Sequence, residues 1–182
     1  MKKANAWLAL LTYLVLLVHV VYQVVSYIAF YYNPVLTKTF AYVTMGLFVA
    51  HAILSLVILV RNHDAKPLEM EYKGINARTY MQRIFGILMC VLLPLHIFMM
   101  VILSKNVGTI FYNIEEVAIV LFFWALFTHV GLSLSNAFVT LGWLSDIKVK
   151  KVMDVVIFII CQILFAVTSF VVVLTFRKLL YG

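Results

Sequence analysis

The sequence predicts an all-α membrane protein, a bundle of five transmembrane helices. Of its 182 residues, 65% are hydrophobic and only 12% are charged, whereas soluble domains hold about 25% charged residues. The hydrophobic residues gather in five runs, each long enough to cross a hydrocarbon layer of roughly 30 Å. None of the runs alternates apolar and polar residues as barrel strands do, and an α-helix satisfies its own backbone hydrogen bonds in lipid. We therefore expect one helix per run.

The five helices follow one another with short connections. Their predicted bounds are 6–30, 40–60, 84–103, 117–140 and 152–176. Asn33-Pro34 breaks the helical pattern after the first helix, and Gly108 lies in the connection after the third. The longest connection, 61–83, is too short to form a soluble catalytic domain. Residues 1–182 are thus predicted to form a single transmembrane domain.

The distribution of charge predicts the orientation. When the helices cross the membrane alternately, ten of the fourteen Lys and Arg residues fall on the same side as the N-terminus. The positive-inside rule makes this side cytoplasmic and places the C-terminus outside. The net charge of +7 then reflects topology and lipid headgroups, and no nucleic-acid partner is expected. The first run is too long for a signal peptide and no transit segment precedes it, so we expect a retained helix in a bacterial cytoplasmic membrane.

Four of the five histidines lie near the middles of the first four predicted helices, one in each: His19, His51, His96 and His129. The fifth, His63, is beside Asp64 in a polar loop and is expected to be solvated. An unsatisfied polar group in hydrocarbon costs several kcal/mol. A single such histidine is more often a hydrogen-bonded packing residue than a ligand. Four in consecutive helices indicate a common cause, because intramembrane ionisable groups face the bundle interior and mark ion, proton or electron pathways.

Depth and spacing predict how these histidines pair. At about 1.5 Å per residue, all four lie roughly 15 to 21 Å from the inner face. His19 and His96 are 77 residues apart, and His51 and His129 are 78 apart. Helices one and three run in the same direction, as do helices two and four, so each near-equal spacing places two imidazoles at matching heights. Two pairs across the bundle are expected.

Facing imidazoles about one porphyrin apart are what bis-histidine ligation of haem iron requires. In each ligand, the second ring nitrogen is expected to donate to the carbonyl four residues back. These carbonyls belong to Val15, Leu47, Leu92 and Ala125. Small residues near the ligands leave room for a macrocycle or, alternatively, permit close helix packing. They are Gly46, Ala50, Gly86, Ala125 and Gly131. Pro94, two residues before His96, is expected to kink the third helix.

The segment Asn76-Ala77-Arg78-Thr79-Tyr80-Met81-Gln82-Arg83-Ile84-Phe85-Gly86, with His96 thirteen residues after Arg83, resembles a known motif. It is similar to the Q-R-x-x-G…H entry to the third helix of the cytochrome b anchors of succinate dehydrogenases and fumarate reductases. The stretch His129-Val130-Gly131-Leu132-Ser133 leading to Gly142-Trp143 similarly resembles the fourth helix of that family. Five helices with ligands in the first four resemble its single-chain, two-haem branch over essentially the whole chain.

The resemblance implies ligation of one b haem by His19 with His96 and of a second by His51 with His129, the latter nearer the cytoplasmic subunits. It implies a flavoprotein and an iron–sulfur subunit as cytoplasmic partners, which hold the FAD and the clusters. Electrons would pass between those subunits and a membrane quinone, of menaquinone type. A higher oligomer of the complex is compatible with this family.

Two residues depart from the family pattern. Phe85 stands where a small hydroxyl residue is usual after the Arg, so the quinone contact sometimes assigned there lacks its side chain. Phe127 stands where some members have a carboxylate proposed for proton return, and that route is therefore unsupported.

Polar residues at the two ends suggest further contacts. For quinone, the candidates are Gln23, one turn beyond His19, and Glu115 with Glu116, which begin the fourth predicted helix. Alternatively the two acids complement a helix dipole, and Gln23 bonds a neighbouring helix. The inner basic residues could meet haem propionates, dock a partner subunit, or contact only lipid headgroups. They include Arg78, Arg83 and Lys148.

Two other functions use the same features. The nearer is a cytochrome b anchor of another quinone-linked dehydrogenase, such as a hydrogenase, formate or nitrate enzyme. The other is a non-redox proton or metal transporter, against which stands the absence of a central Asp or Glu. A single zinc site fits less well because it needs three or four converging ligands. Cys90 and Cys161 lack a C-x-x-C pattern and are expected to be small packing residues.

Overall fold

The computed structural model describes residues 1–29, 31, 33–61, 73–103 and 109–181, and in these ranges the regular structure consists of five long α-helices. The helices are α1 Lys2–Ala29, α2 Pro34–Arg61, α3 Lys73–Leu103, α4 Thr109–Leu141 and α5 Ile147–Tyr181. Each is long and apolar enough to cross a membrane. The predicted fold class, an all-α multi-pass membrane protein, is therefore confirmed.

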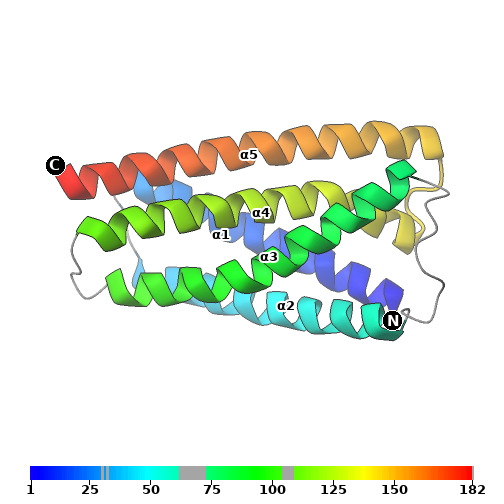
Figure 1. The fold of residues 1–182 in the computed structure, drawn as a ribbon, viewed down its shortest axis with the longest axis horizontal. Helices are drawn as coiled ribbons and strands as arrows, with labels where there is room; N and C mark the ends of the chain where they lie inside the picture. Colours follow the sequence, from blue (N-terminus) through cyan, green and yellow to red (C-terminus); the bar gives the residue numbers. More distant parts are fainter. Residues whose placement is uncertain (30, 32, 62–72, 104–108, 182) are drawn as a thin grey trace.

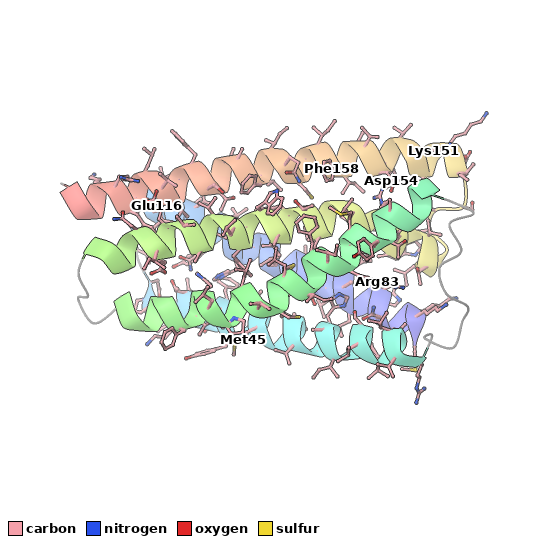
Figure 2. All side chains as sticks on the ribbon, viewed as in Figure 1. Met45, Arg83, Glu116, Lys151, Asp154 and Phe158 are labelled. Carbon is pink, nitrogen blue, oxygen red and sulfur yellow. The ribbon has the colours of Figure 1, made fainter. Side chains whose placement is uncertain are left out.

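The helices share one long axis and run antiparallel in succession, so that the two termini lie at opposite ends of the bundle (Figure 1). We call these ends the N-terminal end and the C-terminal end. Figure 2 shows Arg83, Asp154 and Lys151 toward the N-terminal end and Glu116 toward the C-terminal end. The cytoplasmic assignment of the N-terminal end stays a prediction.

Every helix extends beyond the apolar run that predicted it. α3 begins at Lys73 and not near Ile84, so that the polar segment before the run is helical. α4 begins at Thr109, which places Glu115 and Glu116 in its second turn and not at its start. Apolar runs mark only the part in hydrocarbon, whereas i→i−4 hydrogen bonding continues through polar residues at the membrane boundary.

The helix boundaries have local causes. Asn33 is the N-cap of α2: its Oδ1 accepts from the backbone N–H groups of Val35 and Leu36, at 3.0 and 3.2 Å. Pro34 occupies the first helical position, where no backbone donor is needed. At the end of α4, Gly142 has a positive φ of 82° and donates to the carbonyl of Val139. This left-handed residue ends the helix and lets α5 begin five residues later.

The core is unevenly shared among the helices. α4 is central and packs against α1, α3 and α5. Its buried residues Phe122, Ala125, Leu126, Phe127 and Val130 form half of the main hydrophobic cluster. α2 has no buried residue and packs mainly on α1. The region between α2 and the rest of the bundle is consequently less filled than that around α4.

Candidate cofactor-binding site

The four intramembrane histidines come from four helices and form two pairs. His19 of α1 and His96 of α3 lie close enough to interact electrostatically, and so do His51 of α2 and His129 of α4. All four are partly buried within the chain. The structure therefore brings together the imidazoles of alternate helices.

The two pairs lie at different levels of the bundle. Near the N-terminal end, the side chains of Asn5 and Ser55 exchange hydrogen bonds of 3.2 and 3.3 Å, which fixes the register of α1 against α2. His51 precedes Ser55 by one helical turn, so it is level with about residue 9 of α1 and roughly 15 Å from the level of His19. Our depth estimate from sequence placed all four histidines in one slab because it could not include this register.

His129 is anchored by α3. Its Nδ1 lies 2.9 Å from the backbone oxygen of Gln82. Because a carbonyl can only accept, Nδ1 carries the proton and Nε2 keeps its lone pair. The prediction that this ring bonds the carbonyl of Ala125 is wrong. The ring leans toward α3 instead, where Gly86 leaves space beside it.

The other three imidazoles have no such anchor. Among the described residues, the buried Nδ1 atoms of His19, His51 and His96 have no hydrogen-bond partner, so the predicted bonds to the carbonyls four residues back are not formed. A buried, unsatisfied ring nitrogen is costly in an apolar setting. A metal that takes a ring nitrogen of each imidazole removes part of this cost, and neutral imidazoles in pairs are a donor set that suits haem iron.

Space for a flat apolar group exists beside the histidines. An apolar groove of about 470 Å³, open toward the outside of the bundle, lies between α2 and α3. The lining residues are Met45, Val49, Leu93, Pro94, Ile97 and Phe98. Gly46 faces open space, with nothing within 4 Å of an added Cβ. The ring of His96 stacks on Phe122 at a centroid distance of 5.5 Å and an interplanar angle of 7°. Paired imidazoles beside an apolar groove are compatible with a flat, apolar metal complex such as haem.

Gly131 has a different role from the one expected of a ligand neighbour. A Cβ there would lie 3.0 Å from Cδ2 of Phe158 and 3.4 Å from Cβ of Cys161, both on α5. Gly131 therefore permits close packing of α4 on α5. Cys161 is buried in this contact and Cys90 is exposed on α3, so only Cys161 fits the packing role in this chain.

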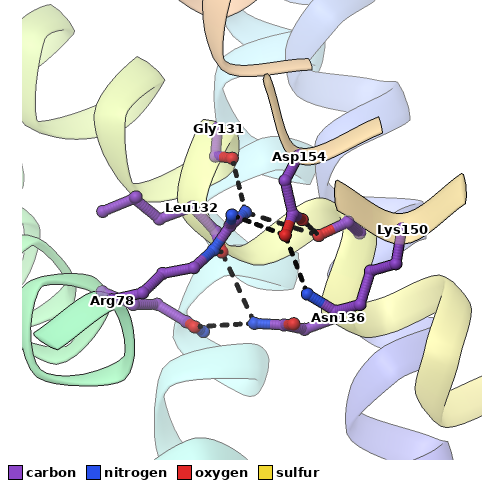
Figure 3. Close-up of polar contacts among 8 residues, drawn as sticks. Arg78, Gly131, Leu132, Asn136, Lys150 and Asp154 are labelled. Carbon is purple, nitrogen blue, oxygen red and sulfur yellow. Dashed lines mark hydrogen bonds and ion pairs between the residues drawn. The ribbon is translucent and has the colours of Figure 1, made fainter. Parts of the chain in front are cut away.

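A polar cluster joins α3, α4 and α5 near the N-terminal end, as Figure 3 shows. The Arg78 guanidinium binds Asp154 at 2.8 Å and donates to the backbone oxygens of Leu132 and Gly131 at 3.0 and 3.3 Å. Asp154 also accepts from Lys150 at 2.9 Å and from Ser135 through a short hydrogen bond. Arg78 is thus turned into the bundle, whereas Arg83 and Lys148 are exposed and do not join the cluster.

Sequence reasoning missed Asp154. The signal was an acid inside the fifth apolar run, four residues after Lys150, where an i,i+4 pair forms. Its partner Arg78 is on α3, far away in sequence, so one helix alone does not reveal the contact.

The acids of α4 differ from each other. Glu115 is fully buried, and neither oxygen of its carboxyl group has a hydrogen-bond partner within the part of the chain that the structure describes. Glu116 binds Arg177 of α5 at 3.2 Å. Gln23 is partly buried on α1, one turn beyond His19. Glu115 lies two turns before Phe122, about 10 Å along α4 from the ring that stacks on His96. His63 and Asp64 lie outside the described residues.

Within the described ranges, no three His, Cys, Asp or Glu side chains converge on a point where they could hold a metal ion. Comparison with protein-family models, curated proteins and solved structures gives no match.

Proposed function

We propose that this chain is the membrane anchor of a succinate:quinone oxidoreductase, a cytochrome b with two haems. His19 and His96 would hold one haem, and His51 and His129 the other. The observation that supports this most is the arrangement of four imidazoles as two pairs on alternate helices, at two levels of the bundle. Haem, when bound, supplies reversible one-electron chemistry.

The residues of the chain hold the iron and control its surroundings. The imidazoles would supply the nitrogen ligands of the iron, and the apolar side chains of Val49 and Leu93 would lie beside the group. The levels of the two pairs, roughly 15 Å apart along α1, set the spacing of redox centres across the membrane. A membrane anchor would contribute the spacing and the ligation of the redox centres to electron transfer.

The N-terminal end is the proposed docking surface for an iron–sulfur subunit, which would connect the anchor to a flavoprotein. Exposed basic residues cluster there: Lys2, Lys3, Arg83, Lys148 and Lys151. Basic side chains at this position also suit the anionic lipid headgroups of a bacterial cytoplasmic membrane. Arg78 is excluded from this surface because the cluster with Asp154 engages it.

The C-terminal end is the proposed region of quinone exchange. Glu115 offers a buried carboxyl group without a partner, and Gln23 and Glu116 are the other candidates there. A quinone needs an apolar slot and a proton-exchanging group near the redox centre. Menaquinone is the proposed quinone type, on the family resemblance.

Optical spectroscopy of the complex purified through this chain tests the proposal. We expect a reduced-minus-oxidised b-type spectrum, two haems per chain, and co-purifying flavoprotein and iron–sulfur subunits. His19→Ala and His51→Ala should each remove a different spectral component. A colourless complex would refute haem binding. Subunits of a hydrogenase, formate or nitrate enzyme would refute the succinate assignment while leaving the cytochrome b anchor.

A non-redox transporter is the alternative of a different class. It predicts a colourless protein with pH-driven flux, and no convergent metal-binding group within the described residues supports it.

A further inference from the structure

We infer that Gln82 and Gly86 are positioning residues that hold His129 as the Nδ1–H tautomer and leave its Nε2 free to bind a metal. The pairing of that nitrogen with iron rests on the proposed function; the tautomer itself does not. The Gln82 to Gly86 segment of α3 thereby positions the imidazole of His129, which is on α4. It also makes the two histidine pairs unequal.

The backbone carbonyl of Gln82 is accessible to a side chain from a neighbouring helix. In an α-helix, side chains tilt toward the N-terminus, so the residue at i+4 covers the carbonyl of residue i. For Gln82 that residue is Gly86, which has no side chain. The carbonyl oxygen has two lone pairs, one of which can serve the helix while the other accepts from a neighbouring helix. Glycine thus uncovers an acceptor in the middle of a helix.

The imidazole ring of His129 lies close to Gly86. A Cβ added there would lie 3.2 Å from Cε1 and 3.4 Å from Nδ1 of His129. The ring therefore occupies the space that any other residue at this position would fill with its side chain. The position of the imidazole and the 2.9 Å bond to the Gln82 carbonyl depend on the same missing side chain.

Polar contacts fix the register of α3 against α4. The side chain of Gln82 accepts from Nδ2 of Asn136 at 3.4 Å, while its main chain accepts from His129. Asn136 and His129 are seven residues apart, two turns of α4, and so lie on the same face. One turn earlier on α3, Arg78 bonds the α4 backbone at Leu132. These contacts hold the Gln82 carbonyl at the height of the imidazole.

The consequence is a preformed ligand in one pair only. A second-shell hydrogen bond fixes the tautomer and orientation of a metal-binding histidine, and its loss typically costs 10- to 100-fold in metal affinity. His129 has this bond, whereas the Nδ1 atoms of His19, His51 and His96 have no partner among the residues that the structure describes. The site of His51 and His129 therefore begins with one oriented ligand, and the site of His19 and His96 begins with none.

The test uses nitrogen NMR of the full chain, labelled with ¹⁵N-histidine, produced without haem and placed in lipid nanodiscs. The His129 signal is assigned by its loss in His129→Gln. We expect the Nδ1–H tautomer in the unsubstituted chain and a loss of that preference in Gly86→Val. Gly46→Val is the matched control, because nothing lies within 4 Å of its added Cβ. Gln82→Met should keep the tautomer, since the acceptor belongs to the main chain.

A His129 that keeps the Nδ1–H tautomer in Gly86→Val, or that is Nε2–H in the unsubstituted chain, overturns the inference. Gly86→Ala provides a milder change if the valine variant does not fold, with a smaller displacement of the same signal expected. In the haem-loaded complex, Gly86→Val should weaken retention at the His51 and His129 site by 10- to 100-fold. If the tautomer result holds but no haem is found, the positioning role stands and the proposed function fails.

Discussion

The ion pair between Arg78 and Asp154 should be one of the stronger polar contacts of the bundle. The side chains are 23% and 14% exposed, and the carboxylate has three partners. Hydrogen bonds to charged groups contribute about 1.5–3 kcal/mol each, against about 0–1 kcal/mol for a solvent-exposed pair. We expect Asp154→Ala to destabilise the bundle by about 2–4 kcal/mol, since Arg78 then lacks its charged partner at a mostly buried site.

A double-mutant cycle measures the pairwise part of this effect. Arg78→Ala, Asp154→Ala and the double variant are unfolded by denaturant in detergent micelles, and we expect a coupling energy of about 1–3 kcal/mol. The matched control is the ion pair of Arg177 with Glu116 at the other end, where the arginine is 52% exposed and the contact is a single one of 3.2 Å. Its coupling should stay below about 1 kcal/mol. Equal coupling energies for the two pairs would refute the reasoning from burial.

Two further substitutions, Glu115→Leu and Gly131→Leu, test other parts of the bundle by the same unfolding measurement. Gly46→Leu is the control for the second. Glu115→Leu should stabilise the bundle by about 1–3 kcal/mol, because it removes a fully buried carboxyl group that has no partner among the described residues. If Glu115 exchanges protons with quinone, the same substitution should slow quinone turnover. A loss of stability would instead indicate an unrecognised partner of the carboxyl group. Gly131→Leu should destabilise by at least about 1–3 kcal/mol, since a Cβ already comes within 3.0 Å of Phe158. Gly46→Leu, which meets open space, should change stability by less than about 0.5 kcal/mol, and equal effects at the two glycines would contradict the packing argument.

The helices could be predicted because the free energy of moving a segment into lipid depends on the composition of about twenty consecutive residues, which the sequence alone provides. Their ends were not, because Lys73 and Thr109 begin helical turns that no apolar run marks. Direction and spacing sufficed to match His19 with His96 and His51 with His129. The separation of the two levels depends on the register of α1 against α2, fixed by the contact of Asn5 with Ser55.

The hydrogen-bond partner of His129 shows a different limit. A rule based on one helix pointed to the carbonyl of Ala125, but the acceptor is Gln82 on another helix. Which acceptor is used depends on how closely α3 and α4 approach at Gly86, a property of two surfaces together. The role of Asp154 was not predictable for the same reason. The contribution of a carboxylate at a membrane boundary to stability depends on its partner, and here the partner lies on another helix.

The lack of buried residues on α2 has a consequence for biogenesis. α1 and α2 leave the ribosome first, yet α4, which contributes more buried core residues than any other helix, is made later. During that interval α2 must persist as a helix solvated by lipid, and the absence of charge between Lys38 and Arg61 allows it to do so. Because α2 packs mainly on α1, its contact with α1 is extensive and its contacts with the other helices are few. The helix that bears His51 can therefore join the bundle together with α1, after α4 has been made.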